Sequence, residues 1–147
     1  MGLASFAVPD SAVTASSTWS ASYKPGDGRL HFQKTSSPLR YGAWSTLGGK
    51  YLKGSWWQVD FGSWTKVTII ATQGRQDKSQ WVTKYRVSYS YDGLFFKYYM
   101  EADYPKVFSS RFKKIFCLPP IRPFPRPLRS IRFGDVSKAN ANFAWTT

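Results

Sequence analysis

The fold class is decided by one stretch, WWQVDFGSWTKVTIIATQGRQDKSQWVTKYRVSYSYDG, which spans residues 56–93. Near its end, Tyr85, Val87 and Tyr89 would share one face of an extended chain, with charged or small residues on the other face. This alternation is typical of a half-buried antiparallel strand. A polar break at 72–81, TQGRQDKSQW, separates this strand from the apolar one before it. The break therefore needs an explanation other than sheet formation.

The rest of the chain continues the pattern of short strands and turns. Asp92-Gly93 favours a tight hairpin, because both residue types tolerate a positive φ angle. No segment carries a sustained helical periodicity, and loops rich in Pro, Gly and Ser are expected at 24–28, 35–44 and 47–55. We expect an all-β protein, an antiparallel sandwich or barrel, with strands at 56–62, 66–74, 84–93 and 94–101.

The charge of the chain is positive and unevenly distributed. The formal net charge is +13, and residues 106–138 hold nine basic side chains against Asp135 alone. A basic segment of this kind attracts the phosphates of nucleic acid or acidic lipid. The alternative is that the segment is simply a solvated surface, and the sequence leaves both readings open.

Catalytic and metal sites find little support in the sequence. His31 is the only histidine, so no Ser/His/Asp pairing with an independent second site can be built. Cys117 is the only cysteine, which excludes an intrachain disulfide and a zinc finger. The acidic residues show no paired-carboxylate or metal-ligand spacing. We predict no enzyme activity, cofactor or metal site. No apolar run approaches the roughly 20 residues of a membrane span, and no signal peptide is visible at the start of the sequence.

Six motifs follow one another along about the first 108 residues: VPDSAVTASSTW, DGRL, GAWS, WWQVDFGSWTKVTIIATQGR, QWVTKYRVSYSYDG and KVF. Their order and spacing resemble the discoidin domain, also called the coagulation factor V/VIII type C domain, over about residues 2–108. The resemblance implies a jelly-roll-like β-barrel of about eight antiparallel strands. It also implies an extracellular or cell-surface adhesion module, whose loops at one end of the barrel bind glycans, a protein such as collagen, or acidic phospholipids.

The C-terminal region departs from the family pattern. Family members carry a cysteine near each end, joined by a disulfide, and this chain lacks that pair. Three prolines at 123, 125 and 127 cannot donate to a strand ladder, so only 128–133 is expected to pair as a strand. Residues 134–147 show no closing strand. The resemblance thus predicts a discoidin-like domain at 1–133 and a divergent tail at 134–147. A truncation or an altered reading frame would explain the missing last strand, and a genuinely divergent C-terminus is the alternative.

The resemblance also assigns a purpose to the polar break, which would be a recognition loop at one end of the barrel. Arg75 would project from the strand end with its guanidinium group free to bind carboxylate, phosphate or sugar hydroxyl groups. Two other loops would form the remaining walls of the cleft. The implied ligand contacts are Trp19, Tyr23 and Lys24 in the first loop, Leu39, Arg40 and Tyr41 in the second, and Arg75, Gln76 and Asp77 in the third.

Several of these residues have a structural alternative. Trp19 could close the barrel end, and Arg75 could be a clamp paired with Asp77 or Asp27. Asp60 is predicted to form hydrogen bonds within the barrel. One of Trp56 and Trp57 is predicted to lie in the core, because the two residues are adjacent in a strand. All the remaining tryptophans are predicted to pack in the barrel: Trp44, Trp56, Trp57, Trp64 and Trp81.

Three functions from different classes follow. The motif series favours an extracellular glycan- or protein-binding module, and acidic phospholipid binding is the variant in which the loops meet a membrane surface. A nucleic-acid binder would use the basic segment together with Tyr23 and Tyr41 as stacking platforms, although we expect nucleic acid to be a poor partner. A degenerate domain would bind nothing.

Overall fold

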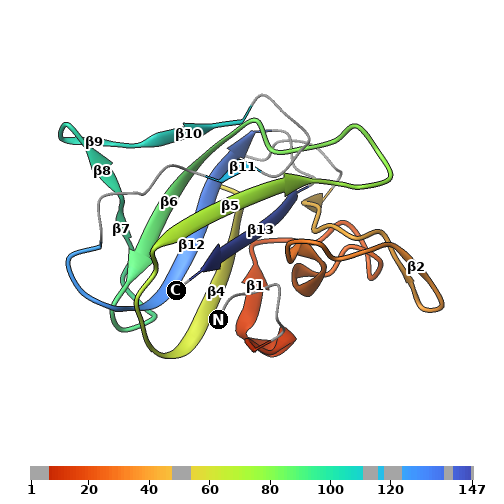
Figure 1. Cartoon of the computed structure of the whole chain (residues 1–147), viewed down its shortest axis with the longest axis horizontal. Helices are drawn as coiled ribbons and strands as arrows, with labels where there is room; N and C mark the ends of the chain where they lie inside the picture. Colours follow the sequence, from red (N-terminus) through yellow and green to blue (C-terminus); the bar gives the residue numbers. More distant parts are fainter. Residues whose placement is uncertain (1–6, 48–53, 111–115, 118–123, 138–140, 147) are drawn as a thin grey trace.

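The computed structural model describes residues 7–47, 54–110, 116–117, 124–137 and 141–146. In this part the regular secondary structure is almost entirely β-strand (Figure 1), with two short 3-10 helices, η2 (Asp10–Ala12) and η3 (Pro25–Gly28). The strands are β1 (Val13–Ala15), β2 (Thr35–Ser36), β3 (Leu39–Arg40), β4 (Trp56–Thr65), β5 (Ile69–Gly74), β6 (Lys84–Ser90), β7 (Lys97–Tyr98), β8 (Met100–Glu101), β9 (Tyr104–Pro105), β10 (Val107–Ser109), β11 (Phe116–Cys117), β12 (Leu128–Ser137) and β13 (Ala141–Thr146).

The strands form two main antiparallel sheets. The larger sheet has the order β1-β4-β12-β6-β10, with β7 also paired to β6. The smaller sheet has the order β11-β5-β13. Figure 1 shows β5 and β13 lying over β4, β12 and β6, so the two sheets stack as layers. The expected all-β antiparallel sandwich is confirmed.

The hydrophobic core lies between these layers and follows from the alternation of each strand. In β4, Trp57 and Val59 are fully buried, whereas Trp56 and Gln58 are half-buried on the other face. Ile131 and Phe133 of β12 are also fully buried. The register pairs Ile131 with Val59 and Phe133 with Trp57. One of Trp56 and Trp57 was expected in the core, and Trp57 is that residue.

The turn after β6 is wider than the sequence predicts. Tyr89 pairs with Lys97 and β6 ends at Ser90, so 91–96 form the connection, and the prediction of a tight hairpin at Asp92-Gly93 is wrong. The Asp92 carboxylate accepts hydrogen bonds from the backbone N–H groups of Leu94 (2.8 Å) and Phe95 (2.9 Å) and from Ser90 Oγ (2.8 Å). These bonds lower the pKa of Asp92 to about 2. The side chain organises the turn and favours a wider loop than a two-residue hairpin.

The C-terminal region contains both the expected strand and an unexpected one. Residues 128–133 form the first part of β12, as predicted, after the prolines. The prediction of no closing strand is wrong, because β13 pairs with β5 from Ala141↔Gly74 to Thr146↔Ile69. This segment contains no proline, so all its backbone N–H groups are available to pair along an edge of β5 that would otherwise be open. The predictions for 111–115, 118–123 and 138–140 lie outside the described residues.

The tryptophans expected in the barrel divide into buried and exposed ones. Trp44 is fully buried and donates its indole N–H to the Ser17 carbonyl at 2.9 Å, which confirms its packing role. Trp81 is half-buried. For Trp64 the prediction is wrong, because 62% of its surface is exposed near the end of β4, where its ring stacks on Tyr91 at 6.4 Å. Alternation breaks down there because the pairing of β4 with β12 is irregular between Asp60↔Ser130 and Thr65↔Leu128, where Gly62 adopts a positive φ of 71°.

Candidate functional site

The loop after β5 and the β2–β3 hairpin lie at the same end of the sandwich (Figure 1). Three aromatic rings of the neighbouring loops stack on one another there. Tyr23 lies between Trp19 and Tyr41, with ring centroids 5.2 Å and 4.7 Å away and rings inclined by 16° and 23°. We call Trp19, Tyr23 and Tyr41 the aromatic row. Trp19 is 47% exposed, Tyr41 is half-buried and Tyr23 is buried. Trp19 therefore does not plug the barrel, and the row presents an apolar surface to solvent.

Arg75 holds this row from inside the protein. Its Nε and Nη2 donate to the two carboxylate oxygens of Asp77 at 2.9 Å and 2.8 Å. Its Nη1 donates to the Tyr23 hydroxyl at 3.1 Å and to Gln80 Oε1 at 3.0 Å. The guanidinium carbon also lies 5.5 Å from the Tyr23 ring centroid and 5.3 Å from that of Tyr41. Only 3% of Arg75 is exposed.

The prediction of a projecting Arg75 with a free guanidinium group is therefore wrong, and the clamp alternative with Asp77 is correct. Burial alone would lower the pKa of Arg75 and raise the pKa of Asp77. Their mutual hydrogen bonds and opposite charges outweigh burial, so the Arg75 pKa is raised and the Asp77 pKa is lowered. Both groups stay charged, and the clamp fixes the loop after β5 to the aromatic row.

The other residues implied by the resemblance surround the row at different depths. Lys24 and Leu39 are exposed, and Arg40 and Gln76 are half-buried. Asp77 is exposed as a residue, although Arg75 occupies its carboxylate. The structure thus brings the three predicted loops together. It leaves Trp19, Lys24 and Leu39 as the predicted side chains most open to a ligand.

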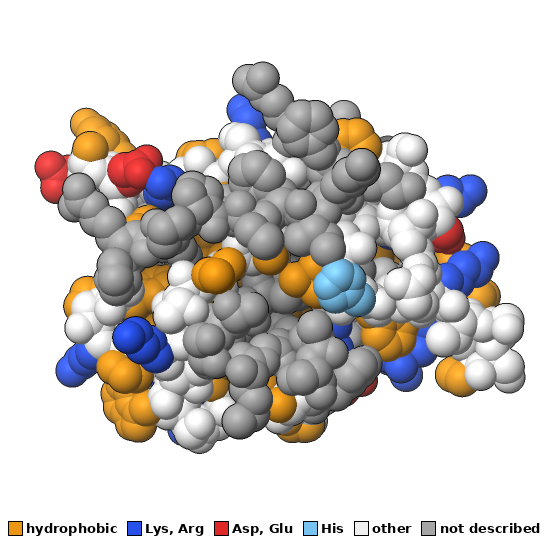
Figure 2. All heavy atoms as spheres, in the orientation of Figure 1, with side chains coloured by type: hydrophobic (Ala, Val, Ile, Leu, Met, Phe, Trp, Pro, Cys, Tyr) orange, Lys and Arg blue, Asp and Glu red, His pale blue; other side chains and the backbone are white. Residues whose placement is uncertain are grey.

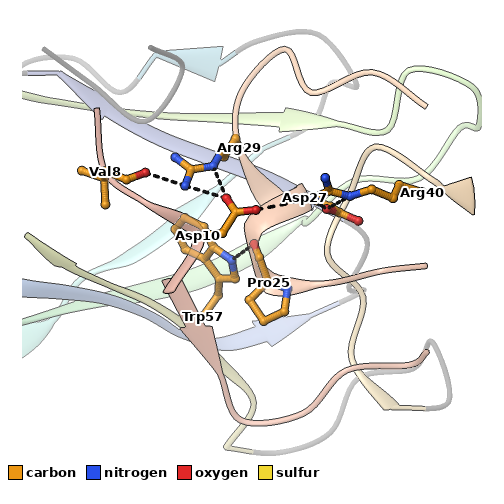
Figure 3. Close-up of polar contacts among 7 residues, drawn as sticks. All are labelled: Val8, Asp10, Pro25, Asp27, Arg29, Arg40 and Trp57. Carbon is orange, nitrogen blue, oxygen red and sulfur yellow. Dashed lines mark hydrogen bonds and ion pairs between the residues drawn. The ribbon is translucent and has the colours of Figure 1, made fainter. Parts of the chain in front are cut away.

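A second ion-pair network lies in the N-terminal part of the chain (Figure 3). Asp27 is fully buried and accepts a hydrogen bond from Arg40 Nε at 2.7 Å. Arg40 also reaches Asp10 Oδ2 at 3.6 Å, and Asp10 Oδ1 accepts from Arg29 Nε and Nη2 at 3.0 Å and 2.8 Å. Burial raises the pKa of Asp27, although Arg40 opposes the shift. The network joins η2, η3 and β3.

A glycine contact sets the position of η3 against the core. The indole N–H of Trp57 donates to the Pro25 carbonyl at 2.8 Å, and a Cβ on Gly28 would lie 2.9 Å from that indole nitrogen. Trp57 is fully buried and cannot move aside. Gly28 is therefore needed for close approach rather than for an unusual φ angle.

Replacing Gly28 with alanine is expected to reduce the free energy of unfolding by about 1–3 kcal/mol, because the added methyl group overpacks a rigid contact. Gly134→Ala is the matched control, since its Cβ would meet nothing closer than 3.9 Å. Urea denaturation of both variants measures the difference. Equal stability of the two variants would show that η3 can shift away from Trp57.

Several supporting residues were missed by sequence reasoning. Lys34 lies 5.4 Å from the Tyr41 ring centroid, and Arg40 lies 4.4 Å from that of Phe32. Gln80 accepts from Arg75 through its side chain and from the Arg75 backbone N–H through its carbonyl at 2.9 Å. Only the placement of Gln80 within the polar break could have indicated its role. The pairing partners of Arg29 and Arg40 depend on the tertiary structure.

The described residues contain no cluster of three or more His, Cys, Asp or Glu side chains that could hold a metal ion. Among them there is also no helix long and apolar enough to cross a membrane. Two open surface pockets lie away from the aromatic row. One, of about 360 Å³, is lined in part by Gln58, Asp60 and Arg129. Asp60 is held there by Arg129 Nε at 2.7 Å and by the Gly62 N–H at 2.8 Å, as its predicted structural role requires.

Comparison with known proteins identifies the family. A family model described as the F5/8 type C domain matches residues 12–144. The chain belongs to this family. Lactadherin from Rattus norvegicus is 37% identical over 116 residues, which cover 74% of this chain and 26% of that relative. The chain thus spans about a quarter of the length of this relative, and the match to the family extends past residue 108 through the C-terminal strands.

Solved structures share the same architecture. Discoidin II from Dictyostelium discoideum gives a TM-score of 0.75 at 20% identity, covering 90% of this chain and 52% of that chain. A fucose binding module from Streptococcus pneumoniae gives a TM-score of 0.62 at 16% identity, covering 99% of this chain and 90% of that chain. At such identities the similarity establishes the fold alone.

Proposed function

We propose that this F5/8 type C domain is a non-catalytic module that binds carbohydrate through the aromatic row. The observation that carries the proposal is the stacking of Tyr23 between Trp19 and Tyr41, with Trp19 47% exposed. A similar fold in a protein described as a fucose binding module supports it. We also propose, from the family resemblance, that the module acts outside the cell or at its surface.

The physical basis is a rigid apolar surface edged by polar groups. The C–H faces of a sugar ring can pack against exposed indole, in the same way that other apolar groups do. Arg75 and Asp77 fix the row before any ligand arrives, so little conformational entropy is lost on binding. The sugar hydroxyls would be bound by exposed polar side chains such as Lys24 at the rim.

Replacing Trp19 with alanine is expected to weaken glycan binding roughly tenfold or more, because the main exposed apolar contact is lost. The matched control is Trp64→Ala, which removes an indole that is 62% exposed at the opposite end of the sandwich. A glycan array followed by calorimetry with the best ligand gives both affinities. If Trp64→Ala weakens binding and Trp19→Ala does not, the site lies elsewhere.

A second candidate function is binding to an anionic phospholipid surface. Leu39 and Leu47 are exposed, and Leu47 comes two residues after Ser45, whose carbonyl accepts the backbone N–H of Trp19 at 2.9 Å. Exposed apolar side chains on loops can enter the interfacial region of a bilayer when nearby charge assists them. Sedimentation with phosphatidylserine vesicles tests this function. Tight binding that is lost in a Leu39→Ser, Leu47→Ser variant with intact glycan binding would support it as a separate activity.

A further inference from the structure

The acidic groups near the aromatic row are all occupied by arginines. Asp77 is paired with Arg75, and Asp27 is paired with Arg40. Asp10 is paired with Arg29 at 2.8 Å. The side chains of Arg29 and Arg75 are almost fully buried. These pairs neutralise each carboxylate locally, so the acidic residues give the surface around the row little negative charge.

Two lysines remain beside the row without an ion pair in the described part of the chain. Lys34 places its ammonium group 5.4 Å from the Tyr41 ring centroid and also lowers the pKa of Asp77 through its charge. Lys24 directly follows Tyr23 in sequence and is exposed, while its carbonyl accepts the Asp27 N–H at 2.9 Å. One lysine therefore lies beside the ring at one end of the row, and the other is the exposed residue that follows the central ring in sequence.

Basic side chains predominate on the surrounding surface, with a smaller acidic patch among them (Figure 2). Figure 2 shows several Lys and Arg side chains at the end of the molecule where Figure 1 places the β2–β3 hairpin and the loop after β5. Exposed lysine ammonium groups are strongly hydrated point charges, and they gain most from a ligand that brings an opposite charge. A neutral sugar would use the aromatic surface but would bring no opposite charge to these ammonium groups.

We propose that the glycan bound by this module is acidic: an oligosaccharide that packs along the aromatic row and places carboxylate or sulfate groups beside Lys24 and Lys34. This inference rests on the proposed function and names its ligand class. The aromatic row supplies affinity for the sugar rings, and the two lysines supply preference for the charged ones. Carboxylate and sulfate share the required chemistry, a negative group carried on a ring that can stack.

The experiment compares each acidic oligosaccharide with its neutral counterpart by calorimetry. The probes are alginate oligomers and their carboxyl-reduced form, and carrageenan oligomers and their desulfated form. At least one acidic probe is expected to bind about tenfold tighter than its neutral counterpart, and the two pairs separate carboxylate from sulfate. Raising the ionic strength from about 0.05 M to about 0.5 M should reduce this preference, because the lysines are exposed.

Lys34→Gln tests the assignment directly. Its affinity for the acidic probe is expected to fall about threefold to tenfold, with no change for the neutral counterpart. Lys66→Gln is the matched control: it removes the same charge from an exposed lysine in the β4–β5 connection, at the opposite end of the sandwich. Equal losses in the two variants would mean that only net charge matters, and would overturn the proposal.

The outcomes separate this inference from the proposed function. If acidic and neutral probes bind equally and Trp19→Ala weakens both, the aromatic row binds carbohydrate without a preference for charge, and only the further inference fails. If acidic probes bind but Trp19→Ala has no effect, the lysines attract polyanions without the aromatic row, and both proposals fail. If none of the four probes binds although a glycan array identifies a neutral ligand, the preference for acidic glycans is wrong.

Discussion

Replacing Arg75 with alanine is expected to lower the free energy of unfolding by about 2–4 kcal/mol, which would make it one of the most damaging substitutions at the loop end. The side chain is buried and donates to Asp77, Tyr23 and Gln80. Its removal leaves three groups without their donor and frees the loop after β5. Because Asp77 is partly exposed and can be hydrated, we place the loss below that of a fully buried pair.

Urea denaturation measures the loss, and Arg75→Lys is the informative control. Lysine keeps the positive charge but cannot bind both Asp77 oxygens in parallel, so an intermediate stability is expected. Glycan affinity of the folded Arg75→Ala protein should also fall, because Tyr23 loses its donor and the row is no longer fixed. An Arg75→Ala protein of unchanged stability with weakened binding would show instead that the guanidinium group contacts the ligand.

The sheets were predictable because their residues carry a local signal. In β6, Tyr85 and Val87 are buried and Arg86 between them is half-buried, as the alternation predicts, although Ser88 is buried as well. The positions of the loops were predictable from the family resemblance together with the polar break after β5, which two strands flank. What the sequence could not show is the partner of each charged side chain in those loops.

Arg75 illustrates this limit. Its neighbours in sequence suggested an exposed strand end, and exposure would have left its guanidinium group free. The structure instead brings Tyr23 against it from 52 residues away, together with Asp77 and Gln80 from the same loop. A local pattern can identify Asp77 as a possible partner but cannot decide between pairing and ligand binding. That decision depends on how deeply the first loop packs over Arg75.

The prediction about the closing strand failed for a different reason. The expectation for 134–147 rested on a missing family ending and on three prolines upstream, which are features of composition. Strand formation at Ala141–Thr146 requires only backbone N–H groups and a free edge, and β5 supplies that edge. Ala141 pairs with Gly74, directly before Arg75, so the last strand also borders the site.

Replacing Phe133 with alanine is expected to destabilise the protein by about 3–5 kcal/mol, the usual loss for a large aromatic residue removed from a packed core. Phe133 is fully buried, with ring centroids 5.7 Å from Trp57 and 5.8 Å from Tyr85. It lies on β12, and its register partners are Trp57 on β4 and Val87 on β6. The cavity would therefore open where β12 joins two strands of the larger sheet.

Arg129→Ala on the same strand is the control. Its guanidinium group is partly exposed and pairs with a similarly accessible Asp60, so a much smaller loss than that of Phe133→Ala is expected. Urea denaturation of both variants, with comparison of midpoints and slopes, measures the contrast. A small effect of Phe133→Ala would mean that β12 unfolds independently of the rest. A large effect would show that β4 and β6 depend on β12, the strand that joins them.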